Sequence, residues 1–222
     1  MSKQKPKTWK IVTIGDSLTQ GNAPPEFRSP EQDNKFQAFL YRYLKAELKN
    51  ADIDIWNYGI GGQIIGEIIA RVASTLPADI VIIMGGTNDA WRYSHDEEMR
   101  EDVVAEIIEQ LGRGLDAIRS NPKGTTTMVV ACSVPPVADK KTLDPGIHET
   151  INIANEKIAA FCEQSNIFFC DVNEAMRLAD SPEKYADPDL VVPDGVHFTP
   201  AGNKACGEAM GKCVAAIIKS AR

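Results

Sequence analysis

Ser17 is the first residue whose type and setting suggest chemistry. It lies in residues 15–21, Gly-Asp-Ser-Leu-Thr-Gln-Gly, directly after the strand-like run 10–14. Open parallel sheets bind ligands beyond the carboxyl ends of their strands, so a serine at such an edge is a candidate nucleophile. A serine hydroxyl attacks poorly until a base takes its proton, and the oxyanion that then forms needs hydrogen-bond donors. The chain should therefore hold a histidine, an orienting carboxylate and N–H donors near other strand ends.

A histidine that could activate the serine stands near the end of the chain. Residues 194–197, Asp-Gly-Val-His, precede a helix that Thr199 is expected to cap, which places His197 on the loop just before that helix. We expect His197 to take and return the proton of Ser17. Asp194 would hold the imidazole in the right tautomer and stabilise its charged form.

Donors for the oxyanion follow the second and third predicted strands. Gly62 ends the turn after the second strand, and Asn88 follows the third. We expect the backbone N–H groups of Ser17 and Gly62 and the side-chain amide of Asn88 to form the oxyanion hole. This chemistry assigns no task to a metal or an organic cofactor, so none is expected.

The elements that must position these residues alternate between strand-like and helix-like patterns, without repeats or long linkers. Such alternation predicts an α/β fold with a five-stranded parallel sheet covered by helices on both faces. The predicted strands are 10–14, 52–58, 79–84, 125–133 and 167–170. Helical spacing of apolar residues predicts helices after residue 34, over 64–76, over 94–118, near 149–164 and from 200 onward.

Helix starts are expected at a few polar residues, and a local weakening of one helix at two glycines. Asp33 or Asn34 would cap the first long helix, and Ser94 with Glu97 three residues later forms a capping-box pattern. The two glycines at 112 and 114 should weaken the helix that follows this box.

Length and charge narrow the class of protein. The 222 residues fit one domain, 1–222, with a full hydrophobic core. The net charge is −7 and the basic residues are scattered, so a nucleic-acid partner is not expected and a small-molecule ester substrate is. The apolar run after the basic N-terminus is too short for a signal peptide or a membrane span, which predicts a cytoplasmic protein without membrane insertion. Its oligomeric state stays open.

The five cysteines form no Cys-x-x-Cys pair and occur within apolar strand or helix patterns, at positions 132, 162, 170, 206 and 213. Buried free thiols in a reducing compartment explain them better than disulfides or a zinc site.

Four segments together resemble the signature blocks of the SGNH (GDSL) hydrolase superfamily. They are Gly-Asp-Ser-Leu at 15–18, Asn-Tyr-Gly-Ile-Gly-Gly at 57–62, Gly-Thr-Asn-Asp at 86–89 and Asp-Gly-Val-His at 194–197. The resemblance spans nearly the whole chain and implies a flavodoxin-like, three-layer fold. It also implies esterase, lipase, thioesterase or carbohydrate-deacetylase activity. The family's oxyanion glycine falls at Gly62, with Gly61 as the other register; many members have a serine where this chain has Gly61.

Other motifs and simpler interpretations explain less. A serine in a glycine-rich turn, an asparagine after Gly-Thr and a single histidine each usually have a structural role. Here, however, all of these residues would have to be structural while lying at the same edge of the sheet. Residues 61–66 have the glycine spacing of a phosphate loop, yet Glu67-Ile68 replaces its Lys-Ser/Thr pair. The Gly-x-Ser-x-Gly elbow of α/β-hydrolases is missing around Ser17.

Several residues near these motifs are expected to have structural roles or to line a pocket. Asp16 and Asp89 are expected to hydrogen-bond within their own loops, and His95 and His148 to be exposed or to cap helices. Residues 91–93, Trp-Arg-Tyr, could line a substrate pocket or pack on an exposed loop.

The sequence thus predicts a serine esterase that hydrolyses carboxylic esters of small or medium acyl groups through an acyl-enzyme on Ser17. The alternative is a non-catalytic domain of the same fold that binds an acylated ligand or a carbohydrate. Specificity should lie in the segments 22–34, 91–95, 135–148 and 180–193.

Overall fold

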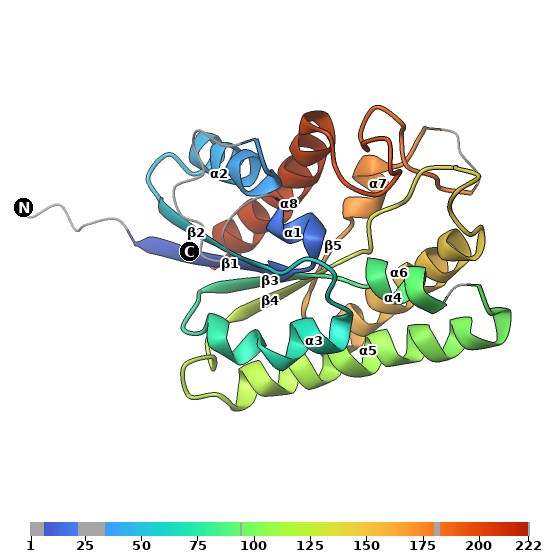
Figure 1. Ribbon diagram of the computed structural model, residues 1–222. Helices are drawn as coiled ribbons and strands as arrows, with labels where there is room; N and C mark the ends of the chain where they lie inside the picture. Colours follow the sequence, from blue (N-terminus) through green and yellow to red (C-terminus); the bar gives the residue numbers. More distant parts are fainter. Residues whose placement is uncertain (1–6, 22–33, 94, 180–182, 222) are drawn as a thin grey trace, which may run out of the picture.

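The computed structural model of the protein describes residues 7–21, 34–93, 95–179 and 183–221 (Figure 1). These residues contain one five-stranded sheet with the strand order β2-β1-β3-β4-β5, and every strand pair is parallel. This is the flavodoxin-like order, so the predicted fold class is confirmed. The strands are β1 (Thr8–Gly15), β2 (Asp52–Gly59), β3 (Ile80–Met84), β4 (Met128–Cys132) and β5 (Phe168–Cys170).

The register of the sheet places the ends of β1, β2 and β3 side by side. Gly15, the last residue of β1, pairs with Gly59 of β2 and with Met84 of β3, and each of these is the last residue of its strand. The segments that follow the three strands therefore leave the sheet at one edge.

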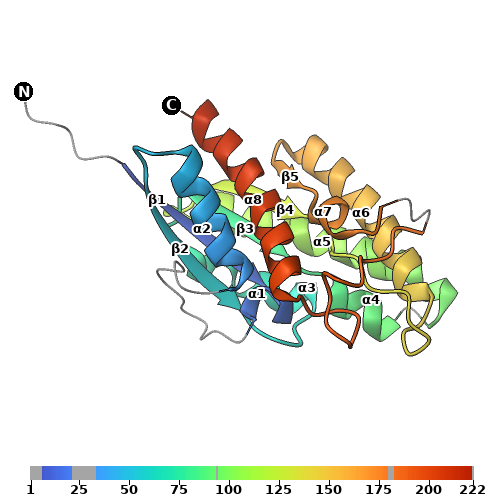
Figure 2. The ribbon, with the colours of Figure 1, turned by 90° about the horizontal axis from the view of Figure 1, so that it is seen from above.

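Helices cover both faces of the sheet and make a three-layer molecule (Figures 1 and 2). α2 and α8 pack against each other on one face with α1 and α7 nearby, and the other face carries α3, α4, α5 and α6. The helices are α1 (Ser17–Gln20), α2 (Phe36–Glu47), α3 (Ile65–Ala70), the 3₁₀ helix η2 (Val72–Thr75), α4 (Thr87–Tyr93), α5 (Glu97–Ser120), α6 (Gly146–Ser165), α7 (Val172–Met176) and α8 (Pro200–Ser220).

Two predicted helix starts are corrected. Lys35 is the N-cap residue of α2, but no side chain at that position caps the helix. The N–H of Phe36, the first residue of α2, instead donates to Asn203 Oδ1 of α8 at 3.0 Å. Asn34 therefore does not cap α2, and Asp33 lies outside the described residues. α5 begins at Glu97 behind Asp96, whose carboxylate accepts the N–H of Glu98; Ser94 also lies outside the described residues.

Several other boundaries differ from the predicted ones. Two short helices, α1 and α4, lie in segments that were expected to be turns or loops, and α7 follows β5 where no element was predicted. The predicted helix 64–76 is divided into α3 and η2. α6 starts at Gly146, earlier than expected. α5 runs unbroken from Glu97 to Ser120 through both of its glycines. A Cβ on Gly114 would lie 2.7 Å from Ile69 Cδ1 of α3, so this glycine allows the two helices to pack closely.

All five cysteines are free thiols; four are buried, as predicted, and Cys213 is half-buried. None of the helices in the described part of the chain is long and apolar enough to cross a membrane.

Candidate active site

Ser17 is held at the end of β1 by a tight turn. The side chain of Asp16 caps α1 by accepting the N–H of Leu18 at 2.9 Å, so the chain enters a helix at Ser17. Gly15 makes the turn possible, because a Cβ there would lie 2.2 Å from Thr19 Oγ1 and 2.3 Å from the Met84 carbonyl oxygen.

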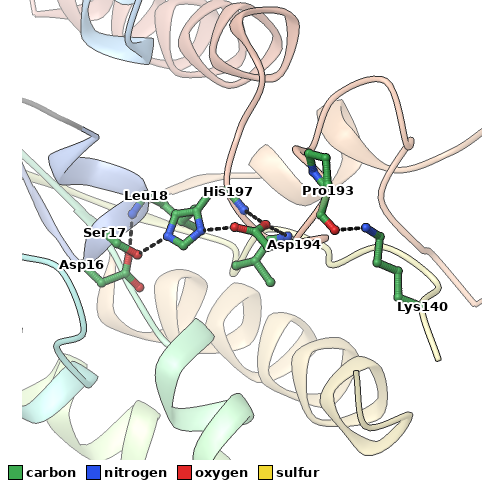
Figure 3. Close-up of polar contacts among 8 residues, drawn as sticks. Asp16, Ser17, Leu18, Lys140, Pro193, Asp194 and His197 are labelled. Atoms are coloured by element: carbon green, nitrogen blue, oxygen red, sulfur yellow. Dashed lines mark hydrogen bonds and ion pairs between the residues drawn. The ribbon is translucent and has the colours of Figure 1, made fainter. Parts of the chain in front are cut away.

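The structure brings His197 and Asp194 to this serine (Figure 3). His197 Nε2 lies 2.9 Å from Ser17 Oγ, and His197 Nδ1 lies 2.7 Å from Asp194 Oδ2. The other carboxylate oxygen of Asp194 accepts the backbone N–H groups of Val196 and His197 at 2.8 and 2.9 Å. The imidazole thus lies between the hydroxyl and a carboxylate that is itself fixed by its own loop.

The electrostatic setting keeps Asp194 ionised. Burial by itself would raise the pKa of Asp194, but the N–H groups of Val196 and His197 and the nearby imidazole outweigh it and hold the pKa below its usual value. An ionised carboxylate at this position favours an N–H on Nδ1 of His197 and leaves Nε2 to accept a proton from Ser17.

Residues before α6 support the Asp194 loop. The Ala138 N–H donates to the Gly195 carbonyl oxygen at 2.8 Å, and the ammonium of Lys140 donates to the carbonyl oxygen of Pro193 (Figure 3). Gly195 has a φ of +83°, which favours glycine. Sequence reasoning missed Lys140, because no local pattern connects it with residues far along the chain.

The turn after β2 lies beside the serine. A Cβ on Gly61 would lie 3.6 Å from Ser17 Cβ, and the Gly61 N–H donates to Gln20 Oε1 at 2.8 Å. Gly62 has a φ of +80°, and its carbonyl oxygen accepts a hydrogen bond from Arg92 Nη2 at 2.8 Å. Of the two candidate oxyanion glycines, Gly61 therefore has its N–H already hydrogen-bonded to a side chain, that of Gln20.

Asn88 lies in the first turn of α4, and its side-chain amide donates to the Gln63 carbonyl oxygen at 2.8 Å. The amide nitrogen carries two hydrogens, so one such bond leaves a second N–H for another acceptor. Asn88 and the Gly62 turn are thereby directly joined.

Two acidic side chains near the site are buried. Asp89 joins α4 to α3 by accepting the Ile65 N–H at 3.0 and 3.2 Å, so it reaches beyond the loop to which we expected it to bond. Burial raises the pKa of Asp89 to about 6. Asp16 bonds its own segment as expected, but burial and, to a smaller extent, Asp89 raise its pKa to about 7. Among the described residues, Asp16 Oδ2 has no hydrogen-bond partner.

A cavity of about 650 Å³ opens beside Ser17 and His197. Its lining combines amide, lysine and apolar side chains: Ser17, Leu18, Gln20, Gly21, Asn34, Lys35, Val192, His197, Phe198, Pro200 and Asn203. Trp91 and Tyr93 are exposed and do not line this cavity. Residues 22–33 of the expected specificity segments lie outside the described residues.

The other two histidines, His95 and His148, do not line this cavity. His95 is exposed, as expected. His148 is buried against Tyr185, with ring centroids 3.8 Å apart, and burial lowers its pKa to about 4, so the expectation of an exposed or capping role was wrong. Across the part of the chain that the structure describes, no group of three or more His, Cys, Asp or Glu side chains could hold a metal ion.

Solved structures with the same fold include two carbohydrate-active esterases. Axe2, an acetylxylan esterase from Geobacillus stearothermophilus, has a TM-score of 0.70 and 24% sequence identity, with 95% of this chain and 96% of that chain covered. Est24, a carbohydrate acetylesterase from Sinorhizobium meliloti, has a TM-score of 0.65 and 20% identity, with 95% and 99% covered. A comparison with curated proteins gave no significant match. At these identities the likeness establishes the shared fold.

A family model gives the classification. The model of the GDSL-like Lipase/Acylhydrolase family matches residues 13–205, a span that includes the serine, glycine, asparagine and histidine segments described above. The chain therefore belongs to the GDSL-like lipase/acylhydrolase family and is a hydrolase that acts on ester bonds.

Proposed function

We propose that the protein hydrolyses carboxylic esters of small or medium acyl groups through a covalent acyl-enzyme on Ser17. The observation that carries the proposal is the continuous chain of contacts from Ser17 Oγ to His197 Nε2 at 2.9 Å and from His197 Nδ1 to Asp194 Oδ2 at 2.7 Å. This is the arrangement that a serine needs to become a nucleophile, because a base must take its proton and a third group must orient that base.

In the acylation step, Ser17 Oγ forms a bond to the carbonyl carbon of the ester while its proton passes to His197 Nε2. The ionised carboxylate of Asp194 stabilises the imidazolium that results. The carbonyl oxygen becomes an oxyanion, which we assign to the backbone N–H groups of Ser17 and Gly62 and to the second amide hydrogen of Asn88. When the C–O bond to the alcohol breaks, the alcohol leaves with the proton from His197.

The deacylation step uses the same groups with water as the nucleophile. His197 takes a proton from water, whose oxygen attacks the acyl carbon, and the same donors stabilise the second oxyanion. Collapse of this intermediate breaks the bond to Ser17 Oγ, which regains its proton from His197. The products are the carboxylic acid, the alcohol and the unchanged enzyme.

The solved relatives support this assignment and suggest a substrate class. Variants of Axe2 in a serine, an aspartate and a histidine three residues after the aspartate are described as catalytic mutants. The spacing between Asp194 and His197 is the same. Axe2 and Est24 act on acetylated carbohydrate, and the cavity here includes the polar side chains of Gln20, Asn34 and Lys35. We therefore propose acetyl esters of a polar, carbohydrate-like alcohol as the first substrates to test.

The alternative of a non-catalytic binding domain is less well supported. A domain that only binds an acylated ligand needs a cavity, but it has no need of a serine hydroxyl directed at an imidazole that an ionised carboxylate orients. A fluorophosphonate probe separates the two functions, because only an activated serine reacts with it quickly.

The proposal is tested with the purified protein, the Ser17→Ala variant and a control, Ser120→Ala, which removes an exposed serine hydroxyl from the end of α5. Each protein is treated with the probe and assayed on p-nitrophenyl acetate, butyrate and octanoate and on acetylated xylooligosaccharides. We expect labelling and turnover in the wild type and in Ser120→Ala, and neither in Ser17→Ala. Equal labelling and turnover in Ser17→Ala would refute the nucleophile assignment.

A further inference from the structure

Two side chains from different elements anchor the backbone on either side of the peptide group that joins Gly61 to Gly62. Before it, the Gly61 N–H donates to Gln20 Oε1 at 2.8 Å. After it, the Gly62 carbonyl oxygen accepts a hydrogen bond from Arg92 Nη2 at 2.8 Å. The Gly62 N–H belongs to the peptide group between these two anchored ones, so its direction depends on both.

The turn needs such anchors because no side chain or backbone atom of the described residues packs against the position of a Gly62 Cβ. Gly62 has a φ of +80°, and no heavy atom lies within 4 Å of the position that its Cβ would occupy. Glycine also has more backbone freedom than any other residue, so two in succession can turn a peptide group at little cost. Hydrogen bonds from outside the turn are what remains to hold it.

Each anchor comes from an element that is itself fixed near the site. Gln20 is the last residue of α1, the helix that begins at Ser17. Arg92 is four residues after Asn88 on α4, so the two lie on one face of that helix. They hold neighbouring carbonyl oxygens, because Asn88 donates to that of Gln63 at 2.8 Å. The turn is therefore anchored to the elements that carry the nucleophile and the oxyanion amide.

We propose that Gln20 and Arg92 are positioning residues that aim the Gly62 N–H at the oxyanion. The inference rests on the proposed function, in which Gly62 is an oxyanion donor, and adds two residues that act through it. A donor must lie within about 2.7–3.1 Å of the oxyanion to stabilise it fully, so a small rotation of this peptide group weakens the bond that lowers the barrier. Binding of the uncharged ester depends much less on that bond.

Arg92 is tested with a pair of variants and a matched control. Arg92→Met keeps an unbranched, flexible side chain and removes its donors, and Arg92→Lys keeps a donor. The control, Arg113→Met, removes an exposed arginine that pairs with Glu109 on α5. On p-nitrophenyl acetate we expect Arg92→Met to lower kcat about 10-fold, less than the loss of a whole oxyanion donor, and to change KM by less than about threefold. Arg92→Lys should recover part of kcat, and Arg113→Met should behave as wild type.

Gln20 provides an independent test from the other side of the peptide group. Gln20→Met removes the acceptor of the Gly61 N–H, whereas Gln20→Glu keeps an oxygen in its place. We expect kcat to fall about 10-fold in Gln20→Met and to be partly retained in Gln20→Glu. Amide hydrogen exchange followed by NMR gives a readout without catalysis, because Gly61 should exchange faster in Gln20→Met than in Gln20→Glu.

The outcomes separate the inference from the function on which it rests. A wild type that reacts with fluorophosphonate, together with Arg92→Met and Gln20→Met that keep kcat within twofold, would overturn the inference alone. Equal losses in Arg92→Met and Arg92→Lys, accompanied by a lower Tm, would show a structural role and also overturn it. A wild type that neither reacts with the probe nor hydrolyses any ester would overturn the proposed function and the inference together.

Discussion

The side-chain amide of Asn88 donates to the backbone carbonyl oxygen of Gln63 at 2.8 Å, which connects α4 to the glycine turn after β2. The same amide has a second hydrogen, which the proposed mechanism assigns to the oxyanion. Asn88 would then both hold the turn and take part in the reaction, and the two tasks have different experimental signatures.

Replacing Asn88 by alanine should remove both bonds. We expect kcat to fall by about 10² to 10³ because the missing donor acts chiefly on the charged tetrahedral intermediate, with KM changed only a few-fold. Loss of the bond to Gln63 should cost about 1 kcal/mol in the free energy of unfolding. Kinetics on p-nitrophenyl acetate and urea unfolding measure the two effects.

Asn88→Asp serves as the comparison for this change. A carboxylate has a similar shape, but it cannot donate to the Gln63 carbonyl oxygen and would face the developing negative charge. We expect it to be at least as inactive as Asn88→Ala. Near-normal kcat in both variants would remove Asn88 from the oxyanion hole and leave the backbone donors alone.

Lys140 should affect catalysis through the Asp194 loop. Its ammonium donates to the Pro193 carbonyl oxygen, next to Asp194, while the Ala138 N–H holds Gly195 independently. We expect Lys140→Met to lower kcat by about 3- to 10-fold with little change in KM, because one of the two supports remains. The exposed neighbour Lys141 provides the control: Lys141→Met should match the wild type, and equal kcat in both variants would argue against this role.

The buried carboxyl group of Asp16 should make stability depend on pH. Burial raises its pKa from 3.8 to about 7, so the folded state binds this proton more tightly than the unfolded state does. The contribution of Asp16 to the free energy of unfolding should therefore fall as the pH rises from about 4 to about 7, by roughly 1.4 kcal/mol for each unit of pKa difference at most.

Asp16→Asn tests this dependence because an amide resembles the protonated acid and can still accept the Leu18 N–H. The variant should be nearly as stable as the wild type at pH 5 and more stable than it at pH 8, as measured by urea unfolding. Asp102→Asn is the control, because it makes the same change at an exposed position on α5. An Asp16→Asn variant whose stability changes with pH from 4 to 8 just as that of the wild type does would contradict the expected contribution of Asp16, because Asp89 and His148 titrate in both proteins.

Two helical glycines should respond in opposite ways to alanine. At Gly207 of α8 a Cβ would lie 2.3 Å from the Phe36 carbonyl oxygen, so Gly207→Ala must push α2 away and should destabilise the fold by about 1–3 kcal/mol. At Gly112 of α5 the nearest atom is Phe161 Cε2 at 3.9 Å, an ordinary contact. Gly112→Ala should therefore raise the free energy of unfolding by about 0.5–1 kcal/mol. Thermal unfolding of the two variants would contradict the packing argument if their Tm values moved in the same direction.

Much of the fold and the identity of the candidate residues could be predicted from the sequence because they depend on short-range patterns. Apolar runs and helical spacing located all five strands and the long helices, and Thr199 indeed caps α8 with its side chain. The contact between Asp194 and His197 is also local, since the two residues are three apart on one loop. Local patterns say little about the strand order or about helix caps that come from other elements. Asn203 of α8, far along the chain, accepts the N–H of the first residue of α2.

What only the tertiary structure decided is how side chains from distant segments meet. Ser17 and His197 are 180 residues apart, and their distance of 2.9 Å depends on the sheet register and on the packing of α8. The bonds from Gln20, Arg92 and Lys140 to backbone groups of other segments, and the burial of His148, leave no periodic signal in the sequence. Such contacts depend on rotamers and on packing to within a fraction of an ångström, whereas sequence spacing encodes only which face of an element a residue occupies.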